Sequence, residues 1–210
     1  MDDNQTWALI HAERAATADL LAGLTPEQWE ASSLCGTWTV RMAAAHIVTG
    51  AEQTKGNFAK RMLANAFNFN KMIDRDARKV AEQPTDELVG RIRARTSTTN
   101  GPPAPVVTML GEVVVHTEDI RRPLGLAGGP SPDATVACLE MYKKATFPIG
   151  SKARIEGLRL TSTDVDWTFG DGPEVRGPAM SLMLAITGRA AGMGGLEGDG
   201  VETLRSRLVR

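Results

Sequence analysis

The chain has three histidines, and two of them are candidates for a shared site. Glu112 and His116 stand four residues apart, which places both side chains on one face of a helix. His46 belongs to another segment with helical patterning, so two facing helices can bring the three groups together. Two imidazoles and a carboxylate suit zinc or another divalent first-row metal. Three protein ligands leave a coordination position open, which is typical of catalytic sites.

Plainer interpretations of the same residues stay open at the level of spacing. Glu112 and His116 could form only a surface pair, worth a few tenths of a kcal/mol. His46 could be a core histidine bonded to a carbonyl group. The context of Glu112 counts against the surface pair, because the residue lies in the apolar run 106–115. A carboxylate without a strong partner is costly in such surroundings.

Acidic and basic residues crowd the segment that follows His116. Asp119 shares the helix face of Glu112 and His116, so it is a candidate for orienting a histidine ligand. A helix cap or a surface ion pair is the alternative. Arg121 and Arg122 stand near a helix C-terminus, where the dipole favours cations. Anion binding is the other interpretation, and Arg122 is the candidate for contacting a cosubstrate.

The third histidine and the two cysteines carry weaker signals. His11 has charged neighbours and a boundary position, so we do not expect it to be a ligand. Cys35 lies in a loop before the His46 helix, and a nucleophilic role would need a paired base or a helix N-terminus. A small buried residue is the simpler interpretation of Cys35, and Cys138 falls on an apolar face. The cysteines form no CxxC pair, which favours a reduced, cytoplasmic protein.

Helical periodicity and capping residues dominate the first two thirds of the sequence. The run 105–121 is rich in β-branched residues, so a buried strand competes with a helix there, but its length and Pro105 favour the helix. Thr25 and Gln28 can form a capping box. No clear pattern covers residues 67–85. The predicted helices span 6–24, a short stretch from 26, 39–67, a short stretch from 85, 105–121 and 131–145.

The pattern of residue types changes after Gly150. Alternating apolar and polar residues predict a strand over 157–163, a partner over 166–170 and a short return over 174–176. Helices are expected over 178–189 and 199–208, with a flexible link at 192–195. We therefore predict an α+β protein with a helical bundle over residues 1–148 and a small α/β domain over residues 149–210.

Composition and charge exclude several classes of protein. The 210 residues carry 24 Lys and Arg against 25 Asp and Glu, a net charge of −1 without the basic excess of a nucleic-acid binder. A hydrophobic content of 42% excludes a disordered chain. No run of 18 uncharged apolar residues predicts a membrane span, and the acidic N-terminus lacks the pattern of a signal peptide.

Several segments carry a resemblance to a known family. Residues 34–41 (LCGTWTVR), leading to His46, resemble the second-helix signature of the DinB-like metalloproteins. Residues 111–125 (GEVVVHTEDIRRPLG) are similar to the signature of the mycothiol-dependent maleylpyruvate isomerase branch. The resemblance extends into the tail, whereas residues 53–104 match poorly. The resembling tail segments are 157–160, 163–167, 172–175, 188–189 and 196–200.

The resemblance implies a four-helix bundle that holds a divalent metal, usually zinc, and a C-terminal α/β domain like a sterol-carrier fold. Its ligand pattern falls on His46, Glu112 and His116. Nickel, iron or manganese could occupy the same donor set. The functional arginine of the family falls on Arg189, which becomes a candidate for binding a substrate carboxylate. Mycothiol is the implied cosubstrate.

These inferences lead to a metal-dependent enzyme that uses a low-molecular-weight thiol for isomerisation or S-transfer on a small electrophilic substrate. Arg189 or the metal would stabilise developing negative charge, and Asp119 would tune a histidine ligand or help a proton transfer. A hydrolase that uses metal-bound water and a non-catalytic metal- or ligand-binding module remain alternatives. We expect small-molecule partners, no nucleic acid, no membrane, and a monomer or homodimer.

Overall fold

The computed structural model describes residues 1–208, and the chain forms two compact units, Met1–Gly129 and Pro130–Arg210. The sequence suggested a division near residue 148 instead. The units divide earlier because α8 (Pro132–Tyr142) packs against α10 (Ala179–Ile186) of the second unit. Helices with a small sheet give the expected α+β class.

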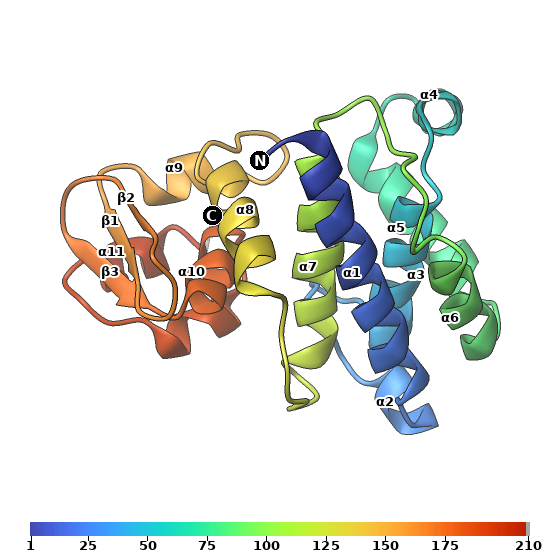
Figure 1. Cartoon of the computed structure of the whole chain (residues 1–210), viewed down its shortest axis with the longest axis horizontal. Helices are drawn as coiled ribbons and strands as arrows, with labels where there is room; N and C mark the ends of the chain where they lie inside the picture. The colour runs from blue at the N-terminus through green and yellow to red at the C-terminus, as the bar shows by residue number, and fades with distance from the viewer. Residues whose placement is uncertain (209–210) are drawn as a thin grey trace. The chain divides into compact units, whose positions relative to one another are not determined.

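Four helices of the first unit form a bundle around a common core. They are α1 (Asp3–Ala22), α3 (Val40–Ala51), α6 (Thr85–Arg93) and α7 (Val107–Arg121), and each packs against two of the others. Figure 1 shows α1 and α7 side by side. Apolar side chains at helical spacing fill the interior, among them Ile10, Leu21, Leu88, Ile92 and Leu110.

Local capping signals fix two of the shorter elements of this unit. The capping box of Thr25 and Gln28 is present and starts α2 (Pro26–Glu30), as the sequence predicted. The single helix expected over 39–67 is wrong, because α3 ends at Ala51 and α4 (Lys55–Ala64) starts anew. Thr54 and Asn57 form a second capping box at this break, which satisfies the backbone N–H groups of the new helix.

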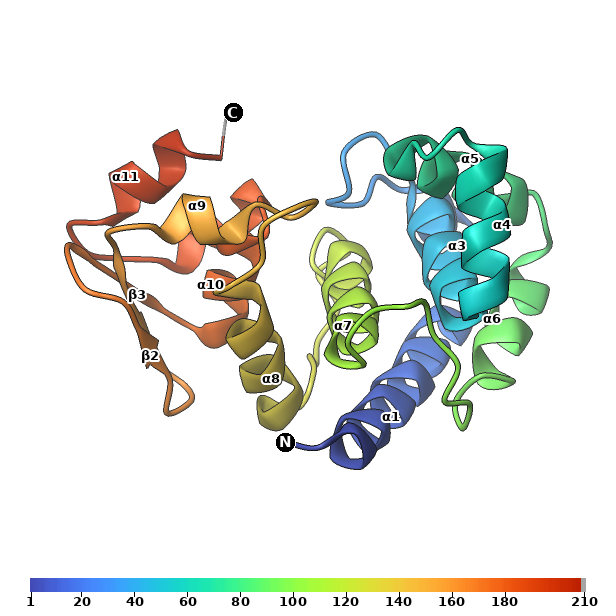
Figure 2. The same cartoon turned by 90° about the horizontal axis from the view of Figure 1, so that it is seen from above.

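A further helix, α5 (Phe69–Ala81), occupies part of the stretch for which the sequence gave no clear pattern. It lies alongside α3, as the view from above in Figure 2 shows. Only two of its side chains, Met72 and Ala77, are buried. The helix is therefore held by a narrow apolar contact and presents charged side chains toward its surroundings.

The second unit contains a three-stranded sheet packed against α10. Strand β1 (Arg159–Ser162) lies between β2 (Thr168–Phe169) and β3 (Glu174–Gly177). It pairs antiparallel with β2, with Leu160 opposite Phe169, and parallel with β3, with Leu160 opposite Val175. The three predicted strand segments are confirmed. Two further short helices of this unit are α9 (Ser151–Ile155) and α11 (Val201–Ser206).

The flexible link expected at residues 192–195 is wrong. These residues belong to a 3₁₀-helix, η1 (Ala190–Gly195), which packs against α10. A Cβ atom on Gly192 would lie 2.5 Å from the carbonyl oxygen of Ser181 and 2.6 Å from the backbone nitrogen of Ala185. The glycine is needed for close packing of two backbones, rather than for flexibility.

Gly192→Ala is therefore expected to destabilise the protein by about 3 kcal/mol, because the backbone atoms that it meets cannot rotate away. Gly194→Ala is the matched control, since a Cβ atom there meets nothing within 4 Å. Both substitutions restrict the unfolded chain alike. Urea unfolding of the two variants measures the difference, and equal stabilities would contradict the packing.

Among residues 1–208, no helix combines the length and apolar character needed to cross a membrane.

Candidate metal centre

The structure brings together the three side chains that the spacing selected. His46 comes from α3, and Glu112 and His116 come from successive turns of α7. The Nε2 atom of His46 lies 3.0 Å from Oε2 of Glu112, and Nε2 of His116 lies 3.8 Å from the same oxygen. The two imidazole rings meet edge to face with their centroids 4.5 Å apart. We refer to these three residues as the triad.

The donor atoms of the triad fit a divalent metal. Metal–ligand bonds of about 2.0–2.1 Å at tetrahedral angles place ligand atoms roughly 3.3 Å apart. The separations of 3.0 and 3.8 Å lie on either side of that value, and one ligand atom from each residue falls within 4.8 Å of the others. The arrangement therefore needs only small side-chain adjustments to hold zinc.

The exposure of the triad differs from what the apolar run suggested. Glu112 was expected to be buried, yet its side chain is 43% exposed, because the residues buried in this part of α7 are its apolar neighbours. His46 is buried, with its side chain only 8% exposed. The triad is therefore accessible on the side of Glu112 and enclosed on the side of His46.

Asp119 fixes the orientation of His116. Its Oδ2 atom lies 2.9 Å from Nδ1 of His116, and the carboxylate is completely buried. Because Nδ1 faces Asp119, Nε2 is left to face Glu112. A carboxylate on the far nitrogen of a histidine is the usual partner of a metal-binding imidazole. The position of Asp119 thus agrees with the orienting role expected from its place on the helix face.

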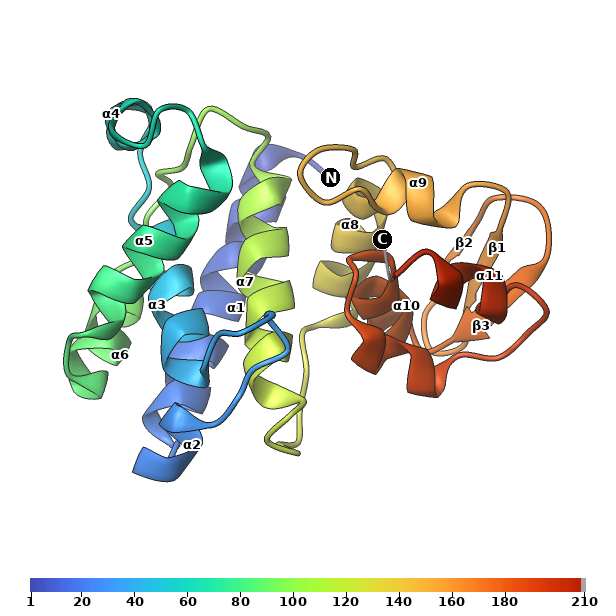
Figure 3. The same ribbon diagram turned by 180° about the vertical axis from the view of Figure 1, so that it is seen from behind.

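The loop at residues 32–39 is tied to the same helix, as Figure 3 shows where the chain between α2 and α3 passes beside α7. The backbone N–H of Leu34 donates to the carbonyl oxygen of Asp119 at 2.9 Å. Ser32 and Thr39 close the loop by an antiparallel bridge, after which Thr39 caps α3. The loop is thereby held against the turn of α7 that carries Asp119.

Cys35 lies near the triad and is half-buried, not fully buried as the sequence analysis expected. It forms a second group of potential ligand atoms with His116 and Asp119. Within residues 1–208, the two groups share only His116. Cys35 was expected to be a small buried residue, and the available signal was its place in the segment that resembles the DinB-like signature. Since Cys35 belongs to the second group, the triad keeps three protein ligands.

Burial and neighbouring charge act in opposite directions on the two histidines. Burial lowers the pKa of His46, and the nearby His116 lowers it further, so His46 is neutral and keeps a lone pair. Burial would also lower the pKa of His116. Hydrogen bonds with Asp119 and Cys35, together with the charges of Asp119 and Glu112, outweigh that effect and raise the pKa of His116 to about 10. A metal must displace a proton from this imidazole.

The arginines that follow the triad pair with Glu118, which is completely buried. Arg121 binds both carboxylate oxygens of Glu118, at 2.7 Å from Nε and 2.6 Å from Nη2. The Nε atom of Arg122 donates to Oε2 of Glu118 at 3.1 Å. Both arginines thus form ion pairs with a buried carboxylate. A contact of Arg122 with the cosubstrate stays a prediction.

The remaining candidates belong to neither group of potential ligand atoms. Arg189 belongs to the second unit, directly before η1, where its Nη1 donates to the carbonyl oxygen of Thr187 at 3.0 Å. Its role toward a substrate carboxylate stays a prediction. His11, which we did not expect to be a ligand, has Nε2 3.1 Å from the carbonyl oxygen of Thr98 and belongs to neither group of ligand atoms.

Asp119→Asn is expected to weaken zinc binding by about 10–100-fold, the usual cost of losing the partner of a histidine ligand. Competition with a chromophoric chelator measures the affinity. An unchanged affinity would contradict the orienting role of Asp119.

The same variant tests the raised pKa of His116 in metal-free protein. A pKa that is higher in the folded state stabilises the fold fully below the unfolded value of 6.5, and this stabilisation is lost as the pH rises to about 10. The stability advantage of the wild-type protein over Asp119→Asn should therefore shrink across that interval. Urea unfolding after chelation measures it, and a constant difference would contradict the assignment.

Comparisons with known proteins found one similar family and two similar structures. Residues 10–101 match the mycothiol maleylpyruvate isomerase N-terminal domain. A crystal structure of the mycothiol-dependent maleylpyruvate isomerase has a TM-score of 0.63 at 15% identity, covering 95% of this chain and 93% of that chain. A histidine-to-alanine mutant of that isomerase gives a TM-score of 0.62 with the same identity and coverage. No curated protein sequence matches the chain. Residues 10–101 are therefore similar to the mycothiol maleylpyruvate isomerase N-terminal domain, and the chain shares the fold of that isomerase.

Proposed function

We propose that this protein is a metal-dependent enzyme that acts on a small electrophilic substrate with a carboxylate group. It uses mycothiol either to isomerise this substrate or to attach the thiol to it (S-transfer). The observation that carries the proposal is the triad, in which three protein ligands converge and one side is accessible. An open coordination position is typical of catalytic zinc, whereas structural zinc has four protein ligands. The similarity of residues 10–101 to the mycothiol maleylpyruvate isomerase N-terminal domain supports mycothiol as the thiol.

The residues of this chain would prepare the site in distinct ways. His46 offers a neutral imidazole, and Asp119 holds His116 with Nε2 toward Glu112. The exposed side of Glu112 leaves room for the cosubstrate to approach. When bound, zinc would lower the pKa of a thiol and favour the nucleophilic thiolate at neutral pH.

The chemistry then belongs to the thiolate and its acceptor. In an isomerisation, the thiolate adds to one carbon of a conjugated double bond, the remaining single bond rotates, and the thiolate leaves, so no atoms are gained or lost. In a transfer, the new carbon–sulfur bond remains and the carbanion formed on the acceptor takes up a proton. Both additions place negative charge on the acceptor, and Arg189 is our candidate for binding its carboxylate by two parallel hydrogen bonds.

The proposal includes zinc as the metal, because two imidazoles and a carboxylate are a frequent catalytic zinc set. It also includes the cytoplasm, where thiols stay reduced, and a monomer or homodimer. Elemental analysis of untreated protein should give a divalent metal, and turnover of an unsaturated dicarboxylate such as maleylpyruvate should require added mycothiol. Protein that cannot be loaded with metal would refute the proposal, and turnover without thiol would favour a hydrolase.

A further inference from the structure

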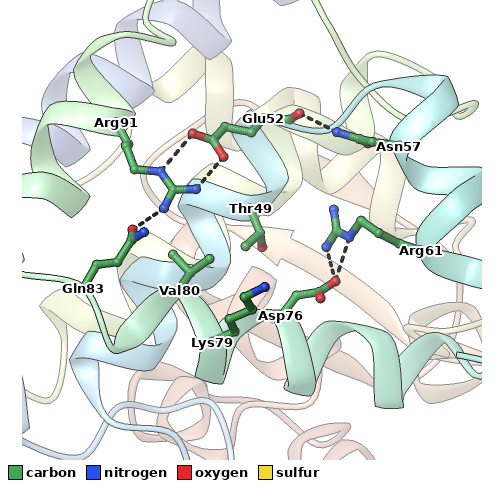
Figure 4. A pocket seen from close by; sticks show the side chains of 9 residues that line it. All are labelled: Thr49, Glu52, Asn57, Arg61, Asp76, Lys79, Val80, Gln83 and Arg91. Carbon is green, nitrogen blue, oxygen red and sulfur yellow. Dashed lines mark hydrogen bonds and ion pairs between the residues drawn. The ribbon is translucent and has the colours of Figure 1, made fainter. Parts of the chain in front are cut away.

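A polar cavity of about 350 Å³ opens between α3, α4, α5 and α6 in the first unit. Figure 4 shows its nine lining residues, of which Val80 is the only aliphatic one. Cavities of this size hold small organic ligands, but such sites are usually lined by apolar side chains. The chemistry of the lining therefore restricts which ligand this polar cavity can recognise.

The arginines of the polar cavity are already matched by carboxylates. Arg91 holds Glu52 through two parallel bonds, with Nε 3.0 Å from Oε1 and Nη2 2.6 Å from Oε2. Nε of Arg61 lies 2.6 Å from Oδ2 of Asp76. An anionic ligand would have to displace these carboxylates or lie beside them, so the two guanidinium groups do not form an anion site.

Hydrogen-bonding capacity nevertheless remains at the polar cavity. Among residues 1–208, Lys79 makes no hydrogen bond or ion pair, and Figure 4 shows its amine directed toward the space beside Thr49. The Thr49 hydroxyl donates to the carbonyl oxygen of His46 at 2.8 Å, which leaves its oxygen free to accept. Asp76 keeps a second carboxylate oxygen besides the one that holds Arg61. Donors and acceptors thus stand close together.

The polar cavity and the triad share helix α3. Thr49 follows His46 by three residues, which is about 4.5 Å along the helix axis. Glu52, at the end of α3, lies about 9 Å from His46 along the same axis. A ligand with a sulfur atom at the triad could therefore extend a second part over this distance into the polar cavity.

We propose that the polar cavity binds the hydroxyl-rich part of the thiol cosubstrate. Hydroxyl groups both donate and accept, so they match the mixed lining better than an anion or an apolar group does. In mycothiol a cysteine-derived thiol is joined through an amino sugar to a cyclic polyol, and the hydroxyl groups of these two rings have that chemistry. The inference rests on the proposed function, and it adds the residues that would recognise the cosubstrate.

Calorimetric titration with S-methyl mycothiol tests the polar cavity, because the methylated sulfur cannot act as a thiolate. Lys79→Gln should weaken binding about tenfold, the effect of losing one hydrogen bond from a charged group. Lys71→Gln is the matched control, since Lys71 lies on the same helix, is exposed and does not line the polar cavity. It should bind like the wild-type protein. Asp76→Asn provides a second variant and should also weaken binding.

Binding that is unchanged in both Lys79→Gln and Asp76→Asn would overturn the inference, as would wild-type protein that does not bind S-methyl mycothiol. Displacement of the probe by inorganic phosphate would also overturn it and indicate an anion site. Metal content should be the same in Lys79→Gln as in wild-type protein, and turnover should be unchanged in the control Lys71→Gln. If wild-type protein shows no thiol-dependent turnover, the proposed function is refuted. The titration with S-methyl mycothiol would still test the polar cavity.

Discussion

His46→Ala and Glu112→Ala should each abolish thiol-dependent turnover and leave the purified protein without stoichiometric metal. Each substitution removes one of three converging ligand atoms. Loss of only the partner of a ligand costs about 10–100-fold in metal affinity, so loss of the ligand itself should exceed about 100-fold. Elemental analysis and initial rates with saturating mycothiol measure the two effects on the same preparations.

His11→Ala is the matched control for the triad variants. It removes an imidazole that contacts the carbonyl oxygen of Thr98 and belongs to neither group of ligand atoms. Metal content and turnover should be retained. Cys35→Ser should also retain the metal, since Cys35 is not one of the triad. Turnover that survives in both His46→Ala and Glu112→Ala would contradict the metal-dependent mechanism.

Arg189→Met should lower kcat/KM for a carboxylate substrate by about 100-fold, equivalent to about 2.7 kcal/mol of transition-state stabilisation. Arg189→Lys should recover only part of this loss, because an ammonium group keeps the charge but cannot form two parallel bonds to a carboxylate. Steady-state kinetics with the acid and with its methyl ester separate the two contributions. The ester should be nearly insensitive to both substitutions.

Metal content should not change in the Arg189 variants, which distinguishes them from the triad variants. Arg159→Met supplies the control, since Arg159 is an exposed arginine on β1 in the same unit. It should behave like the wild-type protein. An equal loss for acid and ester in Arg189→Met would exclude carboxylate recognition as the role of this residue.

Spacing within one helix was the most informative part of the sequence. The four-residue interval between Glu112 and His116 determines that they share a face, whatever surrounds the helix. The same periodicity brings Asp119 under His116, and the structure has both contacts. His46 differs, because its approach to Glu112 depends on how α3 packs against α7. Spacing allowed that meeting, and only the family resemblance favoured it over the alternatives.

Other features depend on competing contributions, such as capping against periodicity, whose relative strength the sequence does not show. The helix expected over 39–67 breaks because the capping box of Thr54 and Asn57 outweighs continued helical periodicity. The two residues of this capping box are present in the sequence, but the prediction did not use them. α5 escaped prediction because only Met72 and Ala77 are buried along it. The exposure of Glu112 was missed because the apolar residues around it turn toward the bundle core, while it faces outward.

The hydrogen bond from Leu34 to the carbonyl oxygen of Asp119 joins two backbones. Such a bond persists through exchange of the side chains at positions 34 and 35. Mutations in the loop can therefore accumulate during evolution without displacing the turn that carries Asp119. The histidine held by Asp119 therefore keeps its place when the side chains of the loop change.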